Sequence, residues 1–175
     1  MSEAAVQHRV QRHAARLLAL SAIFVGLGAC GFRLQGAPHL PVQFARTHLV
    51  VPIDQPLLKR ELAEAIEVSG RTPVDSAEGA TAEVLVREAY SEQRVLSVSA
   101  QGRPREYEVV YRVRFEATAG GKRLLAPQTL ELRRDYPFDE TDVLARQREA
   151  GVLLAAMQRD MARLIQRRLA AVPPP

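Results

Sequence analysis

The sequence predicts an α+β fold, with two helices packed on one face of a four-stranded mixed sheet in the order β-α-β-β-β-α. Two segments with apolar residues at helical spacing and one long segment in which apolar and polar residues alternate lead to this prediction. With 175 residues, of which 47% are hydrophobic and 25% charged, the chain has the length and composition of a single globular domain. We therefore expect one hydrophobic core between the helices and the sheet.

The first strand and the first helix are expected between residues 48 and 70. Residues 48–53 form a short apolar run that is typical of a strand. Pro56 then stands where a helix can begin, because the missing N–H of proline would have no partner in the first turn. Apolar residues recur at helical spacing from there to Gly70, which favours the end of a helix.

The longest strand is expected at residues 106–117, where the chain alternates between two kinds of side chain. Apolar and aromatic residues occupy one face: Tyr107, Val109, Tyr111, Val113, Phe115 and Ala117. Charged residues occupy the other face: Glu106, Glu108, Arg112, Arg114 and Glu116. This pattern predicts a strand with one buried face and one solvated face.

Strands are also expected on both sides of this segment. Residues 82–99 alternate in the same way, are rich in β-branched side chains and end at a turn over residues 101–104. On the other side, Gly120-Gly121 closes a hairpin to a partner strand at residues 124–136. The centre of the chain therefore predicts three consecutive strands.

The second helix is expected to end the domain. Asp139 can cap its start, and Glu140 and Asp142 lie near the positive end of the helix dipole. An apolar stripe then runs at helical spacing from Val143 to Leu169. The three terminal prolines cannot continue the helix, so we expect it to stop before them.

The first 29 residues resemble an export signal. Three arginines precede an apolar run at residues 17–27, which is shorter than the roughly 20 residues that cross a bilayer as a helix. A buried core helix is the alternative, but Gly26 and Gly28 interrupt the end of the run. We expect residues 1–29 to be a lipoprotein signal peptide.

The signal ends in Leu27-Gly28-Ala29-Cys30, which resembles a bacterial lipobox. Small residues before the cysteine fit a protease cleft, and the thiol is the nucleophile that receives a diacylglyceryl group. Cleavage leaves Cys30 as the first residue, carrying a diacylglycerol and an N-acyl chain, and no other cofactor is expected. More than one acyl chain gives stable membrane anchoring. The alternative is a free cysteine that packs as a small hydrophobic residue.

The next residue favours the outer membrane as the destination. Gly31 differs from the Asp that tends to retain lipoproteins in the inner membrane of enteric bacteria. We expect a protein anchored by lipid in the inner leaflet of the outer membrane, facing the periplasm. The periplasmic domain is expected at residues 30–172, followed by a proline tail at residues 173–175.

Catalysis and nucleic-acid binding are both disfavoured. The sequence contains no nucleophile elbow, phosphate-binding loop or zinc-protease motif, and His39 and His48 have no adjacent candidate metal ligand. Glu106 and Glu108 could form an acid/base pair, but carboxylates that alternate with arginines are typical of a solvated, self-compensating strand face. Half of the formal net charge of +4 lies in residues 1–29, which leaves little to attract nucleic acid. We expect neither an enzyme nor a metal site.

Several short segments, in the same order, resemble the lipopolysaccharide-assembly lipoprotein family LptE (RlpB). The first residues after the expected cleavage site match the start of mature family members: Cys30-Gly31-Phe32-Arg33-Leu34. Further matches are Gly102-Arg103-Pro104-Arg105-Glu106-Tyr107, Asp135-Tyr136-Pro137-Phe138-Asp139, Val143-Leu144-Ala145-Arg146 and Met157-Gln158-Arg159-Asp160. Together they extend over nearly the whole mature chain.

This resemblance implies a non-enzymatic function in lipopolysaccharide transport. A family member forms a plug inside the LptD β-barrel at a one-to-one ratio, assists assembly of the barrel and binds lipopolysaccharide during delivery to the outer leaflet. Large barrels have polar lumens that a polar plug can fill. The alternative is a stand-alone periplasmic ligand-binding or transporter-auxiliary lipoprotein, which would not co-purify with a large barrel.

The resemblance also implies where lipopolysaccharide binds. Family members carry basic residues near the turn before the long strand and at the start of the last helix. The matching positions are Arg103 and Arg105 at the turn and Arg146 on the helix, with Arg148 nearby. Guanidinium groups match phosphate geometry with two parallel hydrogen bonds. The alternatives are a plain solvated turn and, for Arg146, an ordinary helical pair with Asp142.

Overall fold

The computed structural model describes residue 36, residues 38–137 and residues 143–175, except for the side chains of residues 143–147. The chain forms two compact units, Met1–Gly36 and Ala37–Pro175. The second unit contains every described strand and helix. The signal peptide, Cys30 and the cap expected at Asp139 lie outside the described residues.

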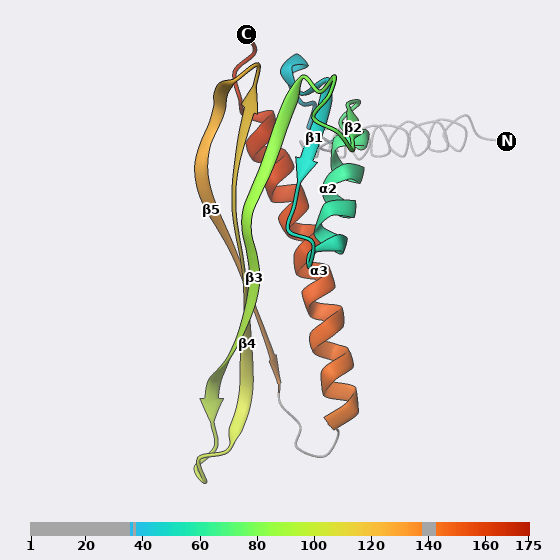
Figure 1. Cartoon of the computed structure of the whole chain (residues 1–175). Coiled ribbons are helices and arrows are strands. Elements are labelled where there is room, and N and C mark those ends of the chain that lie inside the picture. Colours follow the sequence, from blue (N-terminus) through green and yellow to red (C-terminus); the bar gives the residue numbers. More distant parts are fainter. Residues whose placement is uncertain (1–35, 37, 138–142) are drawn as a thin grey trace, which may run out of the picture. The chain divides into compact units, whose positions relative to one another are not determined.

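The sheet has five strands in the order β2-β1-β3-β4-β5 (Figure 1). Their bounds are β1 Arg46–Val50, β2 Thr72–Val74, β3 Ala82–Val98, β4 Pro104–Ala119 and β5 Lys122–Pro137. β1 pairs in parallel with β2 and with β3, whereas β3, β4 and β5 are antiparallel neighbours. The sheet is therefore mixed, as predicted, and its three long strands are joined by hairpins.

The prediction of four strands is wrong because it lacks β2. This strand has three residues, too few to show an alternating pattern, and its central residue is Pro73. Proline cannot donate to a ladder and is therefore confined to edge strands, and β2 is the edge of this sheet beside β1. The observed order of strands and α-helices is β-α-β-β-β-β-α.

Both α-helices cover the same face of the sheet (Figure 1). They are α2, Pro56–Val68, and α3, Val143–Ala170, and a short 3-10 helix, η1, precedes β1 at Val42–Phe44. Pro56 begins α2 as predicted. The predicted packing of two helices on one face is therefore confirmed.

The core lies between these helices and the sheet. β4 contributes the apolar face that the alternation of apolar and charged residues predicts: Val109, Tyr111, Val113, Phe115 and Ala117. The helices contribute Leu58, Leu62 and Ile66 from α2 and Met157, Met161, Ile165 and Leu169 from α3. Tyr107, the outermost residue of the predicted apolar face, is half-buried and packs against the edge of this core.

Buried polar groups join the two layers. The Tyr111 hydroxyl donates to Gln55 Oε1 at 3.0 Å, and Gln158 Nε2 on α3 donates to the same oxygen at 3.1 Å. Burial raises the pKa of Tyr111 to about 12, because the phenolate would lose its hydration. Gln166 Nε2 donates at 2.6 Å to the Ser69 hydroxyl at the end of α2. These bonds fix α3 against β4 and against α2.

β3 and β4 extend beyond the rest of the sheet (Figure 1). β1 pairs with β3 only as far as Leu85, and β5 ends at Pro137, opposite Glu106. β3 and β4 continue together to the pair Val98 and Pro104. The outermost part of the β3–β4 hairpin is therefore only two strands wide.

Candidate functional site

The turn between β3 and β4 positions two of the predicted ligand-binding arginines. Gly102 has a φ of 74°, a backbone conformation that favours glycine. The Ser99 N–H donates to the Arg103 carbonyl at 2.7 Å, and the Gly102 N–H donates to the Ser99 carbonyl at 2.9 Å. The side chains of Arg103 and Arg105 are both exposed. The turn thus presents two cationic side chains at the end of the hairpin.

The start of α3 lies toward the same end of the sheet (Figure 1). Between Pro137 at the end of β5 and Val143 at the start of α3, the connecting chain spans at most about 20 Å. Arg146 belongs to the first turn of α3, and the Arg148 side chain is exposed. The fold therefore brings the four predicted arginines to one end of the sheet, although they come from two separate segments.

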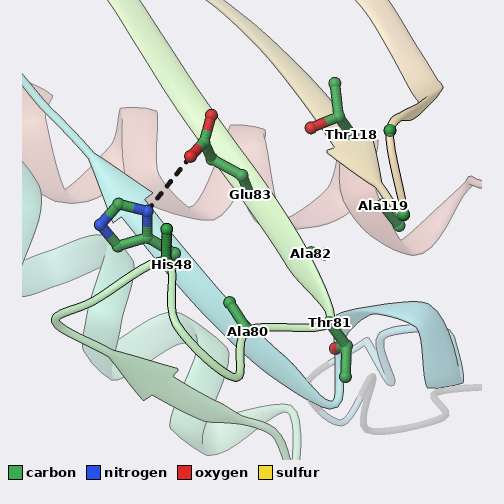
Figure 2. Close-up of a pocket in the computed structure, with 10 residues that line it drawn as sticks. His48, Ala80, Thr81, Ala82, Glu83, Thr118 and Ala119 are labelled. Atoms are coloured by element: carbon green, nitrogen blue, oxygen red, sulfur yellow. Dashed lines mark hydrogen bonds and ion pairs between the residues drawn. The ribbon is translucent and has the colours of Figure 1, made fainter.

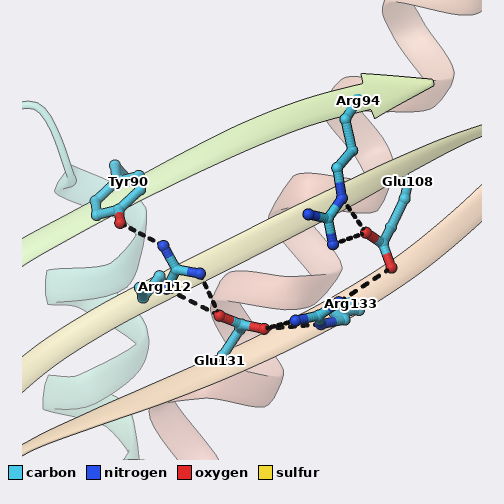
Figure 3. Close-up of polar contacts among 6 residues, drawn as sticks. All are labelled: Tyr90, Arg94, Glu108, Arg112, Glu131 and Arg133. Atoms are coloured by element: carbon cyan, nitrogen blue, oxygen red, sulfur yellow. Dashed lines mark hydrogen bonds and ion pairs between the residues drawn. The ribbon is translucent and has the colours of Figure 1, made fainter. Parts of the chain in front are cut away.

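The face of the sheet opposite the helices carries a connected row of ion pairs (Figure 3). Glu108 on β4 binds Arg94 on β3, and its other oxygen lies 3.8 Å from Arg133 Nη1 on β5. Arg133 Nη2 also lies 2.6 Å from Glu131, which accepts a hydrogen bond from Arg112 Nε at 2.9 Å. Carboxylate and guanidinium groups therefore alternate across three strands.

Arg112 ends this row and also contacts Tyr90. Its Nη1 donates to the Tyr90 hydroxyl at 2.6 Å, and its guanidinium carbon lies 5.6 Å from the ring centroid. The hydrogen bonds to Tyr90 and Glu131 raise the pKa of Arg112 above its usual value. The hydrogen bonds from Arg112 and Arg133 lower the pKa of Glu131. Both groups therefore keep their charges at neutral pH.

Two carboxylates of this face are more buried than the sequence predicts. Glu108 and Glu116 are only 8% and 6% exposed, whereas the alternation predicts a solvated face. Arg94 pairs with Glu108, and Arg87 pairs with Glu116. Val110 on the same face is also buried. Long arginine side chains cover apolar surface with their stems. The prediction of a solvated face is therefore wrong at Glu108 and Glu116, whereas Glu106 and Arg114 are exposed as predicted. The predicted compensation of charge is present in the ion pairs of Glu108, Arg112 and Glu116.

Glu106 and Glu108, the alternative acid/base pair, each accept an ordinary hydrogen bond from a neighbouring side chain. The Glu106 carboxylate accepts a hydrogen bond from the Ser97 hydroxyl at 2.7 Å, and Glu108 accepts one from Arg94. Within residues 38–137 and 143–175, no group of three or more His, Cys, Asp or Glu could hold a metal ion.

An open polar pocket lies at the other end of the sheet, beside the start of β3 (Figure 2). His48 and Glu83 line one side, with His48 Nδ1 3.2 Å from a carboxylate oxygen of Glu83. The remaining lining residues are small: Ala77, Ala80, Thr81, Ala82, Thr118, Ala119, Gly120 and Gly121. The pocket contains no arginine or lysine, so an anionic ligand does not fit it as well as the hairpin end.

These features define a class of protein, a two-layer α+β module for binding or assembly. Its helices cover one face of the sheet, ion pairs compensate the charges of the other, and exposed arginines lie at one end. None of the helices in the described part of the chain has both the length and the apolarity needed to span a bilayer.

The chain belongs to the LptE lipopolysaccharide-assembly family, whose model matches residues 41–169. The match extends from just before η1 nearly to the end of α3, and so covers the whole folded body. It confirms the resemblance found in the short segments of the sequence. The family's role in lipopolysaccharide assembly supports a function other than catalysis.

Solved structures with a similar fold come from several bacteria. The uncharacterized lipoprotein B of Nitrosomonas europaea is 31% identical, with a TM-score of 0.67, over 81% of this chain and 91% of that chain. The rare lipoprotein B of Shewanella oneidensis is 28% identical, with a TM-score of 0.63, over 72% and 94%. A minor lipoprotein of Acinetobacter baumannii, at 20% identity, shares the fold with a TM-score of 0.63, over 73% and 92%. No curated protein matches the chain in sequence.

Proposed function

We propose that this protein is an outer-membrane lipoprotein that plugs the LptD β-barrel, assists its assembly and binds lipopolysaccharide on its way to the outer leaflet. The family match over residues 41–169 carries this proposal. The similarity to lipoprotein B and to rare lipoprotein B supports a lipid anchor, for which the sequence offers Cys30. The acyl chains hold the protein in the inner leaflet, facing the periplasm and the barrel lumen.

The ion-paired face of the sheet suits a polar partner. Glu108, Arg112 and Glu131 are already paired across β3, β4 and β5, so docking there does not leave these charges without a partner. The lumen of a large membrane barrel is polar. Such a face can therefore lie against the lumen wall at a low electrostatic cost.

The arginines at the hairpin end and at the start of α3 are the proposed contacts for lipopolysaccharide. Arg103, Arg105 and Arg148 are exposed, and Arg146 belongs to the first turn of α3. The lipid A part of lipopolysaccharide carries phosphates, which arginine binds with two parallel hydrogen bonds. Binding and release of such a ligand require no catalytic group.

Co-purification tests the barrel partner. The full chain with Cys30 intact, tagged and extracted from outer membranes in mild detergent, is expected to carry one large β-barrel at a one-to-one ratio. Cys30→Ala, which removes the only thiol of the chain, is expected to release the protein from the membrane fraction. Isolation of the parent as a single small protein would overturn the plug and favour a stand-alone binding lipoprotein.

A charge reversal tests the ligand contacts. Arg105→Asp combined with Arg146→Asp is expected to weaken lipopolysaccharide binding by about tenfold or more, because charge-assisted hydrogen bonds contribute about 1.5–3 kcal/mol each. Association with the barrel should remain. The control is Lys122→Asp with Arg123→Asp, which makes the same change of charge at the exposed β4–β5 turn. Equal weakening in both variants would contradict a site at Arg105 and Arg146.

A further inference from the structure

Three large apolar side chains that are close together in the sequence are exposed near the end of β3. Val95 and Leu96 are each 47% exposed and Val98 is 58% exposed, and we call these three residues the hairpin patch. The other exposed large hydrophobic residues of the described chain are single and lie apart from it: Val42, Ile53, Val68, Tyr90 and Val152. Single exposed apolar residues are normal on a protein surface, whereas a local cluster indicates contact with another molecule.

The hairpin patch lies on a part of β3 that has no described strand on its outer side, and Val98 also lies beyond the end of β5. β5 ends opposite Glu106, and β1 has already left β3 at Leu85. The strand register is also irregular between Val95 and Ser97 and again between Ser97 and Val98. Such bulges interrupt the regular ladder that a further strand would need. The patch therefore suits a ligand with apolar groups better than it suits an added strand.

Positively charged side chains lie on the other side of the turn from the hairpin patch. Arg103 and Arg105 are exposed, and the one carboxylate beyond Val95 in the hairpin is Glu106, which accepts a hydrogen bond from Ser97. The end of the hairpin thus combines an excess of positive charge with an apolar surface. A ligand that complements it has anionic groups beside hydrocarbon chains.

We propose that the hairpin patch contacts acyl chains of a single lipopolysaccharide molecule whose phosphates are bound by Arg103 and Arg105. This rests on the proposed function and adds an apolar subsite to it. Lipid A carries its phosphates and its acyl chains on one small disaccharide. Val95 and Val98 lie about 10 Å apart along the strand, so chains that leave a headgroup held at the turn can reach both.

The small size of the hairpin patch favours one bound molecule over a membrane surface. Proteins that bind a bilayer surface through apolar contacts generally present an amphipathic helix with a broad apolar face. The patch instead has only three side chains, all on one strand. Each methylene fully buried against them strengthens binding by about fourfold, so a few methylenes of one acyl chain suffice for a measurable effect.

The test compares intact lipopolysaccharide with lipopolysaccharide from which all acyl chains have been removed. The full acylated protein, in a non-ionic detergent, carries Val95→Thr, Leu96→Thr and Val98→Thr, which place a β-branched side chain at each position and so favour the strand. This triple variant is expected to bind intact lipopolysaccharide at least about tenfold more weakly, and the deacylated form as tightly as the parent does. Thermal unfolding checks its fold, and the single variant Leu96→Thr provides a second test if the triple variant unfolds.

A matched control replaces exposed valines on the helices, with Val68→Thr and Val152→Thr, and is expected to bind both probes like the parent. Unchanged affinity of the triple variant for intact lipopolysaccharide overturns the apolar subsite and leaves the proposed function in place. A parent protein that binds neither probe overturns the proposed function itself. An equal loss of binding to phosphatidylglycerol vesicles would assign the patch to a membrane surface and also overturn the proposal.

Discussion

Phe115 and Leu96 lie on neighbouring strands of one hairpin, yet Phe115 is fully buried and Leu96 is about half-exposed. Around Phe115 the hairpin has β5 beside it and helices against its inner face. Leu96 lies between Val95 and Ser97 on a part of β3 that forms the edge of the sheet, because β1 pairs with β3 only as far as Leu85. Similar apolar residues thus have opposite environments, because the covering elements decide burial and the local sequence pattern does not.

The two regions therefore have different roles. The covered half, where Met157, Met161 and Ile165 pack against β4, supplies most of the apolar burial that stabilises the fold. The uncovered end contributes little to the core but presents arginines and apolar side chains to solvent. A change in the first region should lower stability, and a change in the second should alter ligand binding while stability is kept.

Phe115→Ala should have the largest effect on stability. Phe115 is 0% exposed, so the truncation leaves a cavity in the core and is expected to lower the free energy of unfolding by about 3–5 kcal/mol. Urea unfolding followed by circular dichroism measures this change. A nearly neutral result would mean that the inner face of β4 is not the buried one.

Glu131→Gln tests the ion-paired face and should have a smaller effect, because partly exposed ion pairs contribute little. Arg112 and Arg133 lower the pKa of Glu131 in the folded protein below its ordinary value of 4.5. The charged carboxylate therefore stabilises the fold above that value, and the contribution is lost as the pH falls through the folded-state pKa. The variant should be less stable than the parent at neutral pH, and the difference should vanish in acid. Urea midpoints that differ equally at about pH 7 and about pH 3 would contradict this assignment.

Leu96→Thr should have the smallest effect on stability. The side chain is 47% exposed and lies outside the core, so the free energy of unfolding is expected to stay within about 0.5 kcal/mol of the parent value. The measurement is the same urea titration as for Phe115→Ala. A loss comparable to that of Phe115→Ala would show that the hairpin end is packed against another part of the molecule.

The long elements of the fold could be predicted because their patterns are long. The alternation from Tyr107 to Ala117 and the helical stripe from Val143 to Leu169 each repeat several times, and the structure has β4 and α3 there. β2 could not be predicted, since three residues with Pro73 at the centre show no period. Its pairing with β1 is decided by α2, which returns the chain to the start of that strand.

The candidate site could also be predicted only in part. The turn signal at Gly102 placed Arg103 and Arg105 at a hairpin end, and the structure has them there. The burial of Glu108 could not be predicted, because the arginines that cover it come from β3 and β5. The hairpin patch could not be predicted for a related reason, since its exposure depends on where β1 and β5 end.

The length of β4 has a consequence for how the protein can work at a membrane. Thr81 Oγ1, just before β3, donates to the Gln43 carbonyl, so the chain enters the folded body at the end of the sheet where β4 finishes. The arginine turn lies at the opposite end of β4, which has 16 residues and is about 50 Å long. A bilayer's hydrocarbon interior is about 30 Å thick. The arginine turn is therefore farther from the other end of β4 than that interior is thick, which is the reach that the proposed delivery from one leaflet to the other requires.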